Sequence, residues 1–117
     1  MRMFANKAGV NMTFPAGSII FKEGDPGDCI YVIQSGVIEM VTHDQVIDTC
    51  GPNEALGFMS VIDGFPRTST ARVKEDAVVS KIDQKKFRFM IDEVPNFATY
   101  IMEAMAHRIR GMGRTMR

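Results

Sequence analysis

The sequence predicts a mainly β domain with C-terminal helices: an antiparallel β-roll (a double-stranded β-helix, or jelly roll) followed by two α-helices. Two observations support this prediction. Short apolar segments separated by glycine recur from about residue 10 to residue 83, a spacing typical of antiparallel strands. From about residue 84 to residue 110, apolar residues recur at helical spacing. We expect a single domain over residues 1–117, since a chain of this length folds around one core.

Six segments are predicted as strands because each is rich in apolar or β-branched residues and lies between turn residues. They are residues 18–22, 30–34, 37–42, 46–50, 69–73 and 77–83. Residues 24–28 (Gly-Asp-Pro-Gly-Asp) and residues 43–45 (His-Asp-Gln) supply turn residues between neighbouring strands. Hairpins are therefore the expected connections.

The first predicted helix follows Asp83, which suits the N-cap position. Phe87, Met90 and Ile91 recur at helical spacing, and we expect this helix to end near Glu93.

The second predicted helix begins around Pro95, which fits a first helical turn. One apolar stripe is expected along it, with Ala98 and Met102 beside the stripe. The stripe consists of Phe97, Ile101, Met105 and Ile109. Gly111 and Gly113 are expected to end the helix, since each glycine costs about 1 kcal/mol in a helix interior.

Composition excludes several classes of protein. The 14 basic and 14 acidic residues cancel, which argues against direct nucleic-acid binding. Cys29 and Cys50 lack metal-type spacing and favour a reducing, cytoplasmic setting. No apolar run has the length of a signal peptide or membrane span. His43 and His107 are the only histidines and form no His-x-His pair, which argues against a metal-dependent enzyme. We expect no metal, no cofactor and no enzyme activity.

The segment Gly64-Phe65-Pro66-Arg67-Thr68-Ser69-Thr70 predicts an anion site. A guanidinium such as that of Arg67 can bind two phosphate oxygens at once. Pro66 restricts the backbone before it, and the hydroxyls of Thr68 and Ser69 could donate to the same anion. A solvated loop arginine is the alternative reading of this segment alone.

The upstream motif strengthens this interpretation. Residues 14–28 read Phe-Pro-Ala-Gly-Ser-Ile-Ile-Phe-Lys-Glu-Gly-Asp-Pro-Gly-Asp, and a segment ending in Ser35-Gly36 follows. With the Pro-Arg segment, this order resembles the cyclic nucleotide-binding domain family from about Phe14 to Arg110. The resemblance implies a β-roll, a phosphate-binding cassette and a last helix that commonly serves in dimerisation and in closing over the base.

The resemblance places Gly57, Arg67, Thr68 and Ser69 in the phosphate-binding cassette. A short helical turn is expected at residues 59–63, with its backbone N–H groups toward the anion. Phe58 stands where the family has a glutamate that accepts a hydrogen bond from the ribose 2′-hydroxyl. Glu54, Phe58 and Met59 are the expected pocket residues, and Glu54 could substitute as the ribose acceptor.

The resemblance leaves the nucleotide undecided. Family members that favour cGMP often carry threonine at the position of Thr68, although a β-branched residue also suits the start of a strand. Met112 and Gly113 stand where relatives place polar residues toward the base. Met102 and Met105 could contact the base or fill the core.

The expected function is a regulatory module that binds cAMP, cGMP or a related small anion and signals by movement of its C-terminal helices. An unknown protein effector and a homodimer through the last helix are possible partners. The alternative is a degenerate fold that has lost nucleotide binding and serves as an interaction or dimerisation module, with Phe58 filling the pocket. Arg67→Ala is expected to abolish nucleotide binding with little loss of stability.

Overall fold

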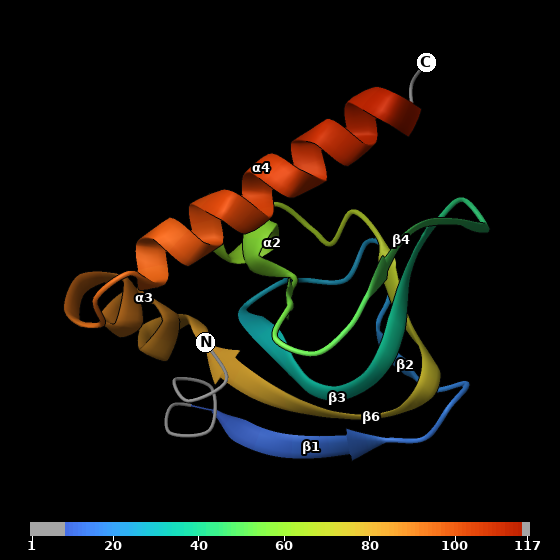
Figure 1. The fold of residues 1–117 in the computed structure, drawn as a ribbon, viewed down its shortest axis with the longest axis horizontal. Helices are drawn as coiled ribbons and strands as arrows, with labels where there is room; N and C mark the ends of the chain where they lie inside the picture. Colours follow the sequence, from blue (N-terminus) through green and yellow to red (C-terminus); the bar gives the residue numbers. More distant parts are fainter. Residues whose placement is uncertain (1–8, 116–117) are drawn as a thin grey trace.

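The computed structural model describes residues 9–115, and the side chains of residues 9–110. Six strands and three helices follow one another along these residues (Figure 1). The strands are β1 (Val10–Phe14), β2 (Ile19–Phe21), β3 (Cys29–Thr42), β4 (Gln45–Cys50), β5 (Ala55–Leu56) and β6 (Thr70–Asp83). The helices are α2 (Phe58–Asp63), α3 (Gln84–Glu93) and α4 (Phe97–Thr115).

All strand pairs are antiparallel, and the long strands β3 and β6 lie side by side at the centre of the sheet. β1 and β2 pair with β6, whereas β4 and β5 pair with β3. Figure 1 shows β3 and β6 curving together, with the three helices gathered on one side of the curved sheet. The predicted mainly β fold with C-terminal helices is confirmed.

Two pairs of segments that were predicted as separate strands each form one continuous strand in the described sheet. Residues 30–34 and 37–42 belong to one strand, β3, and residues 69–73 and 77–83 belong to β6. The β3–β6 register shifts on both sides of Gly36, which has a φ of 93°. A Cβ there would lie 2.4 Å from the carbonyl oxygen of Asp76, so glycine allows a bulge that bends the strand without ending it.

The predicted turn at residues 43–45 and the predicted N-cap at Asp83 are confirmed. His43 and Asp44 have φ values of 52° and 63° in the tight connection between β3 and β4. Positive φ at both central residues is the geometry of a type I′ hairpin. The Asp83 side chain accepts a hydrogen bond from the Lys86 amide at 2.7 Å, and α3 ends at Glu93, as predicted.

The second helix differs from its prediction at both ends. Pro95 lies in the turn before α4, which begins at Phe97, because Asn96 has a positive φ of 68° and breaks the helical path. The helix continues through Gly111 and Gly113 to Thr115. A cost of about 1 kcal/mol for each glycine weakens a helix without necessarily ending it.

The strand β3 divides the interior into two clusters. Tyr31 and Ile33 face the inside of the roll, whereas Ile30 and Val32 face the helices, as the alternation of side chains along a strand requires. The roll cluster also contains buried residues of β2, β4, β5 and β6. The helix-side cluster joins α2, α3 and α4 to the sheet, so α4 and the segment after β5 share one packed region.

Candidate phosphate-binding site

Arg67 lies in the segment between α2 and β6, and only 4% of it is exposed. Its Nη1 donates to the Gly57 carbonyl at 2.6 Å, and its Nη2 donates to the Cys29 carbonyl at 2.7 Å. The guanidinium carbon lies 4.3 Å from the centroid of the Phe21 ring, a cation–π arrangement. Arg67 is therefore part of the packed interior and not a solvated loop residue.

The turn after β2 holds the backbone of this segment in place. The Arg67 amide donates to the Asp25 carbonyl at 2.8 Å, and the Gly24 amide donates to the Arg67 carbonyl at 2.8 Å. The two motifs that were recognised separately in the sequence are thus joined by a pair of backbone hydrogen bonds. This pairing fixes the depth at which the arginine side chain enters the domain.

One nitrogen of the buried guanidinium makes no hydrogen bond. The Nε atom of Arg67 is the buried side-chain nitrogen without a hydrogen bond among the described residues. Neither of the two ion pairs formed within residues 9–110 involves Arg67. An arginine stays charged, and a buried charge without an opposite charge is costly. Arg67 is therefore a buried cation whose Nε has no acceptor among the described residues.

Two glycines make room for the arginine. Gly57 has a φ of 79°, and a Cβ there would lie 2.2 Å from Nη1 of Arg67. A Cβ on Gly27 would lie 2.2 Å from the Cβ of Ser60 and 3.1 Å from Cζ of Arg67. Gly57 was predicted at the site. Gly27 and the carbonyl of Cys29 were missed, because only the fold brings the turn after β2 against α2.

Thr68 and Ser69, both predicted to face the anion, point to different environments. Ser69 is buried, and its hydroxyl lies 2.8 Å from the hydroxyl of Thr42 on β3. Thr68 is exposed, and its carbonyl accepts a hydrogen bond from the Thr42 hydroxyl at 3.3 Å. The alternation of an extended segment separates the two side chains, so they do not converge on one point.

The expected turn of helix is present as α2, and Phe58 is its first residue. The Phe58 side chain is 2% exposed and packs in the helix-side cluster with Val61 and Phe97. Met59 is half-buried against the same cluster. Phe58 therefore joins the cassette to the helices and lies outside the cluster that fills the roll.

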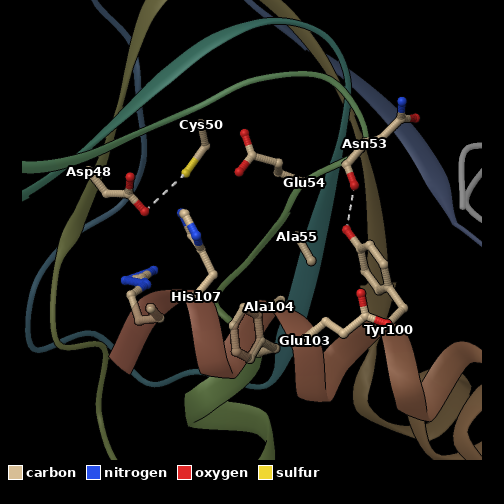
Figure 2. A pocket seen from close by; sticks show the side chains of 11 residues that line it. Asp48, Cys50, Asn53, Glu54, Ala55, Tyr100, Glu103, Ala104 and His107 are labelled. Atoms are coloured by element: carbon tan, nitrogen blue, oxygen red, sulfur yellow. Dashed lines mark hydrogen bonds between the residues drawn. The ribbon is translucent and has the colours of Figure 1, made fainter. Parts of the chain in front are cut away.

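A cavity of about 220 Å³ separates the β4–β5 region from α4 (Figure 2). Its lining contains Glu54 and Phe58, which the sequence had placed at the pocket, but Met59 is not among its lining residues. The lining residues are Asp48, Cys50, Asn53, Glu54, Ala55, Phe58, Tyr100, Glu103, Ala104, His107 and Arg108. The Tyr100 hydroxyl donates to the Asn53 carbonyl and so ties α4 to the β4–β5 connection.

Some polar side chains of the cavity already form hydrogen bonds within the protein. The Glu54 carboxylate accepts a hydrogen bond from the Gly51 amide at 2.5 Å, which closes the turn before β5. The Cys50 thiol lies 3.9 Å from a carboxylate oxygen of Asp48. Figure 2 shows Glu54 and His107 directed into the same space from the strand side and from α4.

Burial raises the pKa of the Cys50 thiol and that of the Tyr100 hydroxyl, both in this cavity, to about 12. For Cys50, the negative charges of Asp48 and Glu54 add to the effect of burial. For Tyr100, the negative charge of Glu54 does so. Both groups are therefore neutral near pH 7. Burial also raises the pKa of Tyr31, in the roll, above its usual value.

These raised pKa values predict loss of stability in alkali. The unfolded chain releases the Cys50 and Tyr100 protons at lower pH than the folded chain, so the free energy of unfolding should fall as pH rises from about 9 to about 12. Urea unfolding at a series of pH values measures this slope. Tyr100→Phe removes one titrating group, and its slope should be shallower; a slope equal to that of the native chain would contradict the assignment.

No group of three or more histidine, cysteine, aspartate or glutamate residues within the described part of the chain could hold a metal ion. Cys29 and Cys50 are both buried free thiols. No helix among the described residues is long and apolar enough to cross a membrane.

The sequence over residues 11–94 matches the family described as "Cyclic nucleotide-binding domain". The chain belongs to this family. The match begins in β1 and ends after α3, so it includes the turn at Gly24, the cassette and Arg67. It confirms the resemblance on which the site prediction was based.

Curated relatives combine this domain with further segments. A CRP-like cAMP-activated global transcriptional regulator of Mycobacterium tuberculosis is 29% identical over 102 residues, which cover 83% of this chain and 46% of the regulator. A cAMP-dependent protein kinase regulatory subunit of Emericella nidulans is 33% identical over 85 residues, which cover 71% of this chain and 21% of the subunit. The cyclic nucleotide-binding domain described here thus spans less than half the length of either relative.

Solved structures share the fold. The Thermus thermophilus catabolite activator protein superimposes with a TM-score of 0.84 at 25% identity, covering 97% of this chain and 56% of that protein. A structure described as "Sp-2Cl-cAMPS bound to PKAR CBD2" superimposes with a TM-score of 0.76 at 20% identity, covering 93% of this chain and 75% of that one. The second likeness is one of fold alone.

Proposed function

We propose that this domain is a regulatory module that binds a cyclic nucleotide through the phosphate and catalyses no reaction. The observation that carries the proposal is the unpaired Nε of Arg67, a charged group that is 4% exposed and lacks an ion-pair partner among the described residues. A cyclic phosphate carries one negative charge and could accept from this atom. The cAMP-related relatives support the same class of ligand.

Anion binding at Arg67 would first use Nε, the one guanidinium nitrogen that makes no hydrogen bond. Nη1 and Nη2 already donate to the Gly57 and Cys29 carbonyls, so a phosphate oxygen at Nε adds a charge-assisted hydrogen bond without breaking either one. The two carbonyl bonds hold the guanidinium plane fixed before the ligand arrives. Such preorganisation lowers the entropic cost of binding.

Ribose recognition must differ from the family pattern. Phe58 has no acceptor and is held in the helix-side cluster. Glu54 lines the same cavity as Phe58, and only one of its carboxylate oxygens is engaged, by Gly51. We therefore propose Glu54 as the acceptor near the sugar.

The signal would pass from the cassette to α4 and from there to a second copy of the chain. Phe58 begins α2 and lies in the same buried cluster as Phe97 of α4, so a shift of the cassette would reach the helix through this cluster. On α4, Met102 and Ile109 are each 59% exposed. The exposure of Ile109 corrects the predicted stripe, of which only Phe97 and Ile101 are fully buried. Met102 was predicted beside the stripe. Met102 and Ile109 are spaced as in a coiled-coil seam and suit a homodimer.

The alternative function is an interaction or dimerisation module without nucleotide binding. It is favoured by the loss of the family glutamate and by the role of Phe58 in joining α2 to the helices. It predicts a stable dimer that does not bind cyclic nucleotides.

Calorimetric titration with cAMP and cGMP distinguishes the two functions, with the mass of the same samples measured by sedimentation. We expect the native chain to bind at least one nucleotide and Arg67→Lys to weaken that binding by about tenfold or more, because lysine keeps the charge but not the planar fork. Arg72→Lys is the control, since Arg72 forms a half-exposed ion pair with Glu39. Absence of binding by the native dimer at millimolar nucleotide would favour the alternative.

A further inference from the structure

A groove of about 320 Å³ lies between α2 and α3, and we call it the α2–α3 groove. Its lining residues are Val61, Ile62, Phe87, Arg88, Ile91 and Asp92. None of them lines the cavity beside α4, and none contacts the Arg67 guanidinium through the bonds described above. The proposed nucleotide site therefore leaves this surface unused.

The apolar residues of the α2–α3 groove range from buried to exposed. Val61 and Phe87 are buried in the helix-side cluster, and Ile91 is half-buried against it. Ile62, on the α2 side, is 49% exposed. Covering these side chains would remove apolar surface from water, which favours association with another surface.

Two opposite charges stand on the α3 side of the groove. Arg88 and Asp92 are both exposed, and their spacing of four residues places them one turn apart on the same side of the helix. Neither of the two ion pairs formed within residues 9–110 includes them. A surface that fits this groove must therefore offer an acidic group opposite Arg88 and a basic group opposite Asp92, one helical turn away.

We propose that the α2–α3 groove binds the same groove of a second copy of this chain. A two-fold axis across α3 sets two such helices antiparallel, so that Arg88 of each copy faces Asp92 of the other. An isologous interface requires this kind of self-complementarity. The same axis brings the apolar linings of the two grooves together, between the two pairs of charges.

Other classes of partner fit the groove less well. The two charges cancel, so the groove offers no net positive field to a phosphate backbone or a small anion. An anionic membrane attracts clusters of basic residues, whereas this groove has one basic and one acidic side chain. A second copy supplies both charges at the required spacing.

This contact goes beyond the proposed function and is separate from the dimer proposed through α4. Met102 and Ile109, the exposed apolar residues of α4, do not line the groove. Self-association at both surfaces would join α4 dimers into larger assemblies. Because only one face of two short helices takes part, we expect a weak contact, with a dissociation constant in the micromolar range or above.

The test is a charge swap followed by sedimentation, in a background chain with Met102→Glu and Ile109→Glu that lacks the α4 contact. We expect this background chain to dimerise as its concentration rises. Arg88→Glu or Asp92→Arg should each weaken dimerisation by about tenfold or more, because like charges then face one another. An equal mixture of the two variants should form a mixed dimer, since opposite charges again face one another.

Lys85→Glu and Glu93→Arg are the controls, because they reverse exposed charges of α3 outside the groove. Neither variant, alone or mixed, should change dimerisation. A background chain that stays monomeric at millimolar concentration would overturn the proposal. So would a mixture of the Arg88→Glu and Asp92→Arg chains that associates no more than either chain alone. The experiment contains no nucleotide, so its failure is distinct from a failure of nucleotide binding.

Discussion

Arg67→Ala is expected to abolish nucleotide binding and also to lower the free energy of unfolding by about 2 to 4 kcal/mol. The substitution leaves the half-buried Gly57 carbonyl and the buried Cys29 carbonyl without this donor, and it removes the group that packs on Phe21. This expectation replaces the prediction, made from sequence, that stability would change little. The reason is burial: the side chain is 4% exposed, so its loss also removes packing and hydrogen bonds from the interior.

Urea unfolding and calorimetry measure the two effects on the same protein. Arg72→Ala is the matched control, because Arg72 pairs with Glu39 in a half-exposed ion pair that contributes about 1 kcal/mol or less. An Arg67→Ala chain with the native unfolding midpoint would show that the guanidinium does not hold the cassette to β3. Retained nucleotide affinity in that variant would exclude Arg67 as the phosphate ligand.

Phe58→Ala is expected to lower the free energy of unfolding by about 3 to 5 kcal/mol. Phe58 is 2% exposed and lies among apolar side chains of the sheet, α3 and α4, so its loss opens a void between the cassette and the helices. Thermal or urea unfolding gives the value. The same reasoning expects Phe58→Glu, the substitution that would restore the family glutamate, to destabilise the domain by burying a carboxylate.

Phe89→Ala provides the control for the loss of a phenyl ring as such. Phe89 lies on α3, is 55% exposed and has Lys86 over its ring. Its removal should cost less than about 1 kcal/mol. Similar losses in the two variants would mean that Phe58 does not couple the cassette to the helices.

Periodicity and turn chemistry were sufficient to predict much of the fold. The alternation along β3, the N-cap at Asp83 and the hairpin at His43 and Asp44 are local features, and each can be seen in a few residues. The bulge at Gly36 could not be predicted as a bulge, because a strand break and a bend have the same local glycine signal. The short strands β1 and β5 were missed, since their pairing depends on distant partners.

The site was predictable in its residue types and less so in its geometry. Arg67 and Gly57 were found from the cassette, and they do contact one another. The burial of Arg67 depends on the backbone pairing with Gly24 and Asp25, and no local pattern encodes that depth. The cavity beside α4 joins residues about 50 positions apart, such as Glu54 and Glu103, and it follows only from the packing of the helix.

The most direct test of the account is the ¹⁵N NMR signal of the Arg67 Nε–H during titration with cGMP and cAMP. This atom is buried and without a partner among the described residues, so its signal reports the arrival of an anion acceptor. We predict a large, saturable shift of this signal and little change at Arg72. An unchanged Arg67 signal at millimolar concentrations of both nucleotides would contradict phosphate binding at this site.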